Sequence, residues 1–323
     1  MDDSFLNAVF HEAGKKTKKR FWLISDLQQG NPANAERYFS AAVSDLKSLD
    51  PALDGVCYLG DAAEGIDLQK LKTMTDMQLS LLDSLNVPVY YSMGNHELDY
   101  YNYCRREGLP PSIPFYETVR QKKNWHLIAD QEDFYFSVEM EDFIMLFFSD
   151  HASKDGSWVA THQFLPPETE PYPHTKEKWQ AVRDEFAKTQ KPVFTFSHCA
   201  YPGGNRPSQF LEQLLPLPEN FRAHFYGHAH IGDHYWAGEH LYRQIACVEH
   251  QQQLQFDISS LDHLRGTTVR SAIFDYYGNG EYAVFFRDHL NHRWENCCIQ
   301  PHDAKSAGLP ENQQHYNKGE IVI

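Results

Sequence analysis

The sequence predicts an α/β protein whose N-terminal half is built on parallel strands. Three short apolar runs alternate there with segments whose apolar residues recur at helical spacing. This order of strand, helix, strand, helix and strand is typical of right-handed parallel crossovers. The last third of the chain shows alternating strand patterns without a long helix between them, so we expect antiparallel strands there.

The N-terminal half is expected to contain three strands and two long helices. Residues up to about Thr17 have little pattern and predict either a loose arm or a short helix. Asp50-Pro51 stops the first long helix. The elements expected after the arm are, in order, strand 21–25, helix 33–49, strand 56–59, helix 68–85 and strand 87–93.

The middle of the chain predicts an irregular segment, a hairpin and two further strands. Residues 100–124 are rich in proline and are interpreted as a surface segment or lid with short helices. A long loop at 153–175 has the length of a functional loop. The other elements expected here are the hairpin strands 134–138 and 143–148, helix 176–188, strand 192–196, helix 210–215 and strand 221–226.

The tail alternates like strands at residues 241–248, 267–277 and 281–287. Gly278-Asn279-Gly280 is typical of a hairpin turn between the last two. The sequence shows no internal repeat and no low-complexity linker. A single domain spanning residues 1–323 is therefore expected.

The composition favours a soluble cytoplasmic protein that does not bind nucleic acid. The formal net charge of −15 disfavours sequence-independent binding to phosphate backbones, which relies on basic side chains. The six cysteines form no CxxC pair, which fits a reducing compartment. The apolar run Phe143 to Phe148 is too short for a membrane segment, and the N-terminus lacks the order of a signal peptide.

Side chains that commonly bind metal ions follow five of the expected strands. Each of them has a simpler explanation when taken alone, such as a turn cap or a buried histidine. Because the strand ends are expected to meet at one rim of one sheet, together they predict a shared site. Carboxylate, amide and imidazole donors suit divalent Mn, Fe or Zn. The residues are Asp26, Asp61, Asn95 with His96, His198, and His228 with His230.

The same residues resemble the motifs of the calcineurin-like metallophosphoesterases. The resemblance implies a four-layer αββα sandwich of two mixed β-sheets, with the site at their shared edge. It also implies that residues 236–300 add antiparallel strands to the second sheet. The matching segments are, in order, Asp26-x-Gln28, Gly60-Asp61, Gly94-Asn95-His96-Glu97, Ser197-His198 and Gly227-His228-x-His230.

The resemblance also implies a role for each residue at two divalent metal ions. Asp61 would bridge the ions, and His96 would protonate the leaving oxygen or stabilise the transition state. A metal-bound hydroxide would attack the phosphorus in line. Asp26, residue 28 and His230 would hold the first ion, and Asn95, His198 and His228 the second.

Gln28 departs from the family pattern, which usually has histidine there. A neutral amide is a weaker donor than imidazole to ions of this kind, so we expect lower occupancy at the first metal site than at the second. Gln29, Asn31 and His151 are alternative donors. Glu97 is a smaller departure, since aspartate is more usual at that position.

The expected function is a dinuclear-metal-dependent phosphoesterase, a hydrolase that acts on a small soluble phosphate mono- or diester. Arg206 lies on the loop after His198 and could grip a phosphate, although a surface arginine explains it equally well. The alternative is a non-catalytic phosphate-sensing or scaffold protein with a weakened first metal site, which Gln28 supports. A nuclease is less favoured because it would need a basic groove.

Overall fold

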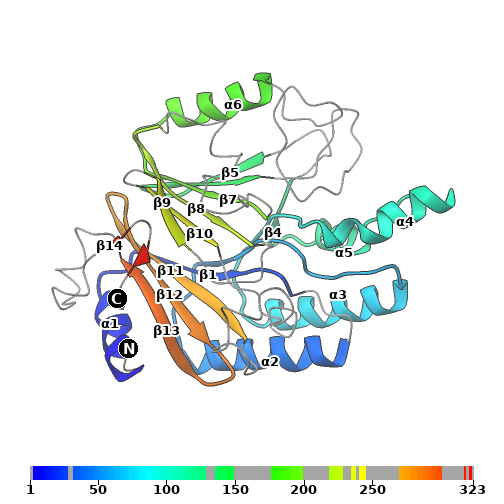
Figure 1. The fold of residues 1–323 in the computed structure, drawn as a ribbon, viewed down its shortest axis with the longest axis horizontal. Helices are drawn as coiled ribbons and strands as arrows, with labels where there is room; N and C mark the ends of the chain where they lie inside the picture. Colours follow the sequence, from blue (N-terminus) through cyan, green and yellow to red (C-terminus); the bar gives the residue numbers. More distant parts are fainter. Residues whose placement is uncertain are drawn as a thin grey trace.

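Two mixed β-sheets lie face to face between layers of helices in the computed structural model of the protein (Figure 1). This is the four-layer αββα arrangement expected from the motifs. The structure describes residues 3–27, 32–128, 135–148, 176–198, 218–227, 234–237, 240–244, 269–299, 316–317 and 320–321.

The first sheet has seven strands, in the order β13-β12-β11-β1-β2-β3-β4. Its parallel half pairs β1 with β2, β2 with β3 and β3 with β4. Its antiparallel half begins where β11 pairs with β1. The strands are β1 (Lys19–Ile24), β2 (Gly55–Tyr58), β3 (Val89–Tyr91), β4 (Trp125–His126), β11 (Arg270–Gly278), β12 (Glu281–Asp288) and β13 (Arg293–Ile299).

The second sheet has six strands, in the order β5-β6-β7-β8-β10-β9. The four inner strands are parallel to one another, and the two edge strands are antiparallel to their neighbours. The strands are β5 (Tyr135–Glu139), β6 (Ile144–Phe148), β7 (Val193–Phe196), β8 (Phe221–Tyr226), β9 (His234–Ala237) and β10 (His240–Gln244). A separate pair is formed by β14 (Tyr316–Asn317) and β15 (Glu320–Ile321).

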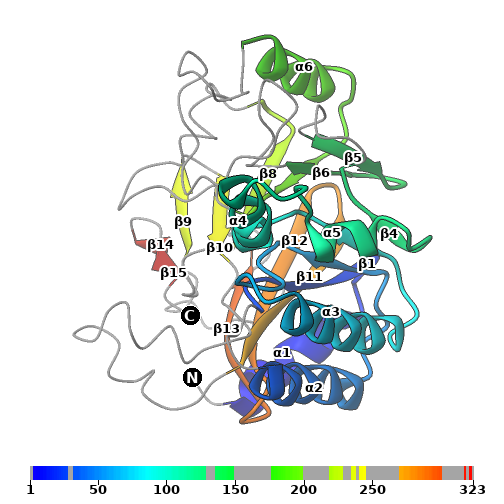
Figure 2. The ribbon, with the colours of Figure 1, turned by 90° about the vertical axis from the view of Figure 1, so that its right-hand side faces the viewer.

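Helices cover the outer faces of both sheets (Figures 1 and 2). The helices α1, α2 and α3 lie on the first sheet, and α6 lies on the second, where Phe186 packs against Phe221 of β8. None of the helices in the described part of the chain combines the length and apolar character of a membrane span. The helices are α1 (Asp3–Gly14), α2 (Pro32–Leu49), α3 (Leu68–Asp83), the 3-10 turn η1 (His96–Leu98), α4 (Asp99–Glu107), α5 (Pro114–Val119) and α6 (Lys176–Ala187).

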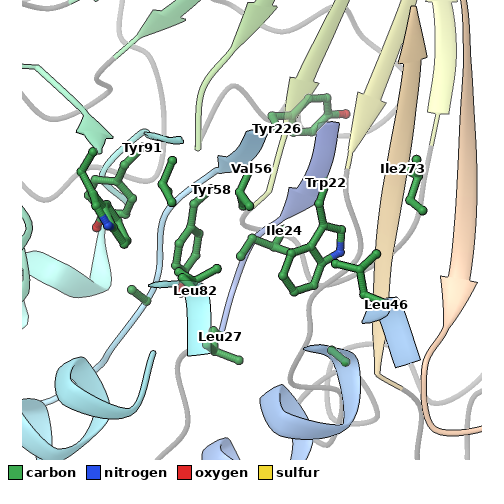
Figure 3. Close-up of a cluster of buried hydrophobic side chains, with 14 of the residues drawn as sticks. Trp22, Ile24, Leu27, Leu46, Val56, Tyr58, Leu82, Tyr91, Tyr226 and Ile273 are labelled. Carbon is green, nitrogen blue, oxygen red and sulfur yellow. The ribbon is translucent and has the colours of Figure 1, made fainter. Parts of the chain in front are cut away.

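The alternation of side chains along β1 explains its central place. Phe21 and Leu23 point into the aromatic layer between the two sheets, and Trp22 and Ile24 face the helices of the outer layer (Figure 3). All four are fully buried, and burying a large apolar side chain contributes roughly 1.5–3 kcal/mol. A strand that is apolar on both faces is stable only where both faces are covered.

The structure confirms most of the expected elements and refines their ends. Strand 221–226 agrees with β8, and the hairpin turn at Gly278-Asn279-Gly280 joins β11 to β12. The N-terminal segment forms a helix, α1, rather than a loose arm. The irregular segment at 100–124 contains α4 and α5. The expected loop at 153–175 and helix at 210–215 lie outside the described residues.

One expectation about the tail is wrong for residues 270–299. These residues form β11, β12 and β13, which extend the first sheet, not the second. Phe274 of β11 is paired with Phe21 of β1, and nearly all of β11 is buried. A strand that is apolar on both faces fits next to β1, where sheet and helices cover it. The sequence pattern of β11 predicts that the strand is buried, but it does not predict which strand lies next to it.

Candidate metal centre

Four of the predicted ligand residues lie close to the ends of four strands that come from both sheets. Asp26, Asp61 and Asn95 follow β1, β2 and β3 of the first sheet, and His198 follows β7 of the second. All four are buried, with at most 3% of their surface exposed. The strand pattern alone predicted one rim of one sheet, whereas the family resemblance implied the shared edge of two sheets. The structure agrees with the second expectation, because the two sheets are stacked with these strand ends adjacent.

Asp26, Asp61 and His198 form a compact group of metal-binding type. One donor atom from each lies within 4.8 Å of the other two. Two carboxylates at this separation in the protein interior repel each other and have lost their hydration, so a bound cation would stabilise the group. Oxygen and nitrogen donors of this kind match divalent transition metals.

His198 has an orientation that fits a metal ligand. Its Nδ1 lies 2.6 Å from the carbonyl oxygen of Leu59, which only accepts, so Nδ1 carries the proton and donates it. The other nitrogen, Nε2, lies 3.2 Å from Asn95 Oδ1 and 3.0 Å from Asp61 Oδ2. In the neutral imidazole a lone pair therefore faces two oxygens. The lone pair and the two oxygens repel one another. A cation bound by these three atoms would remove the repulsion, so the residues fit a metal ion.

Asp61 is a second residue whose surroundings fit a metal ion. Its Oδ2 is buried, lies 3.0 Å from His198 Nε2 and makes no geometrically acceptable hydrogen bond among the described residues. Burial opposes ionisation of this carboxyl, but the rings of His198 and His96, when they are protonated, outweigh burial and lower its pKa. Asp61 is thus a carboxylate with one oxygen directed at the imidazole of His198.

The backbone at both acidic residues of this group is strained. Asp26 and Asp61 have φ angles of 58° and 54°, in the left-handed region, which costs roughly 1–2 kcal/mol per residue. Strain of this kind gathers at functional sites. Two glycines allow the chain to pass nearby, since a Cβ at Gly94 would overlap Asp61 and one at Gly227 would overlap Asp26 and Ser25. The glycines of the two motifs are therefore required by close packing around the acids.

His96 lies at the same site but does not contact the donor group with its ring. Its backbone N–H donates to Asp61 Oδ1 at 2.8 Å, and its Nδ1 lies 3.0 Å from Asp99 Oδ2. About a third of its side chain is exposed. Burial lowers the pKa of His96, but the Asp99 and Asp61 carboxylates outweigh burial and raise it to about 9. The ring can therefore hold a proton at neutral pH.

Asp99 is a residue that the sequence reasoning missed. Besides its contact with His96, its carboxylate accepts a hydrogen bond from the backbone N–H of Gly65 at 2.9 Å. It therefore connects His96 to the loop that follows Asp61. The signal was present in the sequence, because a carboxylate three residues after a histidine meets it on one helical turn.

Glu97 is buried next to the donor group, and its carboxylate binds backbone groups of two loops. Its carboxylate accepts hydrogen bonds from the N–H groups of Gly94, Asp61 and Ala62. Burial and the Asp61 charge raise the pKa of Glu97 to about 7, and its hydrogen bond from Ala62 opposes them. From the sequence alone, Glu97 is only a departure from the more usual aspartate, and these contacts are not predicted.

The remaining predicted site residues lie outside the described residues. Their positions relative to the donor group therefore stay predictions from the sequence. They are Gln28, Arg206, His228 and His230, together with the alternative donors Gln29, Asn31 and His151.

The two stacked mixed sheets and the buried acid-and-histidine group at their strand ends are typical of an α/β protein with a metal-binding site, and the family comparison agrees with this class. Residues 19–232 match the calcineurin-like phosphoesterase family. The chain therefore belongs to the calcineurin-like phosphoesterases. A comparison with curated proteins finds no match.

Solved structures of low sequence identity share the fold. A dimetal phosphatase from Danio rerio has a TM-score of 0.55 at 12% identity, over 88% of this chain and 99% of its own. A purple acid phosphatase from yellow lupin, Lupinus luteus, has a TM-score of 0.54 at 11% identity, over 86% of this chain and 53% of its own. GAP50, the anchor in the inner membrane complex of Plasmodium, has a TM-score of 0.54 at 12% identity, over 88% of this chain and 89% of its own.

Proposed function

We propose that the protein is a dinuclear-metal-dependent phosphoesterase that hydrolyses a small soluble phosphate mono- or diester. The observation that carries this proposal is the buried group of Asp26, Asp61 and His198, whose donor atoms lie within 4.8 Å of one another. A protein that kept the fold for another purpose would gain stability by replacing such a group with apolar residues. Membership of the phosphoesterase family supports the same reading.

The residues divide into two sets around Asp61. The carboxylate of Asp61 is assigned as the shared ligand, because its Oδ2 lies 3.0 Å from His198 Nε2 and one of its oxygens lies within 4.8 Å of a donor atom of Asp26. Asn95 and His198 would hold one ion with His228, and Asp26 would hold the other with Gln28 and His230. When bound, divalent Mn, Fe or Zn would supply Lewis acidity toward the phosphoryl oxygens.

His96 is assigned as the proton donor to the leaving oxygen. Its Nδ1 is occupied by Asp99, so Nε2 is the nitrogen available to a substrate. The partly exposed side chain at the edge of a buried donor group is placed as a general acid would need to be. Arg206 remains a candidate for gripping the phosphate, on the basis of the sequence alone.

The substrate class is inferred from charge. A net charge of −15 disfavours a nucleic-acid polymer, so a small ester is preferred over a nuclease substrate. The competing candidate is a phosphate-sensing or scaffold protein. Its support is Gln28, together with the resemblance of the fold to GAP50, which is described as an anchor.

A panel of chromogenic phosphate mono- and diesters, tested with Mn, Mg, Zn, Fe and Co, separates these functions. We expect metal-dependent turnover of small esters that is lost in Asp61→Asn. The matched control is Glu117→Gln, which changes an exposed glutamate that accepts a hydrogen bond from the backbone of Ile113. Phosphate binding without turnover under any metal would favour the scaffold, and salt-sensitive cleavage of DNA or RNA would favour the nuclease.

A further inference from the structure

Glu97 joins the two loops that carry the proposed ligands Asp61 and Asn95. One of its carboxylate oxygens accepts hydrogen bonds from Gly94 N at 2.9 Å and from Asp61 N at 3.1 Å. The other accepts one from Ala62 N at 2.5 Å. Gly94 belongs to the loop after β3, and the other two amides belong to the loop after β2. A single buried side chain therefore fixes one loop against the other.

Two of these hydrogen bonds come from Asp61, whose backbone is left-handed, and from the residue after it. The amides of Asp61 and Ala62 both point at the Glu97 carboxylate. Successive amides that converge in this way form a concave anion site, and a carboxylate that fills the site stabilises the conformation. Without such an acceptor, two buried N–H groups would be unsatisfied.

The segment that contains Glu97 also holds the side chain of Asp61. The N–H of His96, which precedes Glu97, donates to Asp61 Oδ1 at 2.8 Å. Oδ1 is thereby engaged, and Oδ2 is left directed at His198. Residues 94–97 thus fix both the backbone and the carboxylate orientation of Asp61.

We infer that Glu97 is a positioning residue that holds Asp61 ready to bind metal, and so sets the metal affinity without being a ligand. Both of its oxygens are engaged by backbone amides. The inference rests on the proposed role of Asp61 as a metal ligand. It also gives a reason for glutamate at this position, because the carboxylate must cross from the loop after β3 to residues 61 and 62, and aspartate is one methylene shorter.

The test compares Glu97→Gln and Glu97→Asp with wild type by calorimetric titration of the metal-free protein with Mn²⁺, without substrate. The Gln variant keeps the size but turns one acceptor oxygen into an NH₂ group that faces backbone N–H. We expect both variants to bind Mn²⁺ about 10–100-fold more weakly, which is typical of residues that orient metal ligands. Glu117→Gln, the exposed control, should bind like wild type.

A second readout separates positioning from a general role in folding. Metal-free Glu97→Gln should still unfold cooperatively, and excess Mn²⁺ should restore its kcat toward the wild-type value. Wild-type Mn²⁺ affinity in folded Glu97→Gln, or loss of cooperative unfolding in both Glu97 variants, would overturn the inference. Wild type that binds Mn²⁺ but hydrolyses no ester would refute the proposed activity alone. Wild type that binds no divalent ion would overturn both.

Discussion

At the scale of single residues, the contact between His96 and Asp99 yields the most direct prediction about catalysis. His96→Asn should lower kcat by about 10²–10⁴-fold for an alkyl phosphate, because a poor leaving group needs a proton. The loss should be smaller for a nitrophenyl ester. Asp99→Asn should lower kcat in the same leaving-group-dependent way but less, since it removes only the partner of Nδ1. Steady-state kinetics on paired esters measure the difference.

The control for this prediction is Asp67→Asn. Asp67 caps α3 by accepting hydrogen bonds from Gln69 and Lys70, and asparagine is an equally good cap. This variant should behave like wild type with both esters. Equal losses for the alkyl and nitrophenyl esters in His96→Asn would count against a role in protonating the leaving group.

Gln28 supports a second prediction at the residue scale, made from the sequence. Gln28→His should tighten the weaker of two metal-binding steps, because imidazole is a better donor than an amide to Mn, Fe or Zn. Titration calorimetry of wild type and variant checks the change. Anomalous scattering from wild-type crystals with two equally occupied ions, and Gln28 turned away from both, would contradict it.

At the scale of elements, helix α2 is fixed to the first sheet by one buried carboxylate. Asp45 of α2 accepts two hydrogen bonds from Arg287 of β12, at 2.8 and 2.9 Å. It lies 2.8 Å from His289 Nδ1 and 2.6 Å from His292 Nδ1. The other nitrogen of His289 lies 2.5 Å from Ser271 Oγ on β11. The chain of contacts spans three elements and satisfies every polar group named.

Asp45→Asn should therefore destabilise the protein strongly. Removing one partner of a buried charged pair costs about 3–5 kcal/mol, since the Arg287 charge remains buried without compensation. Urea unfolding should show the loss as a lower midpoint. Asp76→Asn, which breaks an exposed ion pair with Lys72, is the matched control and should change stability by less than about 1 kcal/mol. Equal midpoints for the two variants would contradict this account.

The same contacts predict that acid weakens the fold. Burial lowers the pKa of His289 below its usual 6.5, and Asp45 does not fully offset it, so the folded state favours the neutral ring and loses stability below pH 6.5. Burial opposes ionisation of Asp45, but its bonds to Arg287 and the histidines lower its pKa, so its contribution is present above pH 3.8 and declines below it. The raised pKa of Glu97 adds stability between about pH 7 and pH 4.5 and so opposes the loss from His289 there. Urea midpoints should therefore fall clearly below pH 3.8, where the Asp45 contribution declines, and a flat profile there would refute this.

At the scale of the whole molecule, metal binding should stabilise the contact between the two sheets. Asp61 follows a strand of the first sheet and His198 a strand of the second. An ion held by both at about 1,000 times its Kd adds about 4 kcal/mol. Saturating Mn²⁺ should raise the Tm of wild type by several degrees, and a chelator should reverse the change. Asp61→Asn should show no such rise, whereas Glu117→Gln should respond like wild type.

Much of this architecture could be predicted from sequence because it depends on local patterns. The order of apolar runs and helical stripes gave β1, β2 and α2, and the positions of Asp26 and Asp61 after strands predicted that they converge. The sequence could not place β11 beside β1, since burial on both faces does not identify a neighbour. Nor could it show that Glu97 binds amides of residues 61 and 62, because that contact crosses between two loops.

The pairing of β1 with β11 also has a consequence for how the protein is made. Trp22 of β1 donates a hydrogen bond to Ser271 of β11, and the two residues are 249 positions apart. A ribosome adds about 5–20 residues per second, so β1 is synthesised on the order of tens of seconds before its neighbour. During that time its apolar edge lacks the partner strand. An exposed strand edge of this kind favours aggregation, so the new chain is most prone to aggregate before β11 has been synthesised.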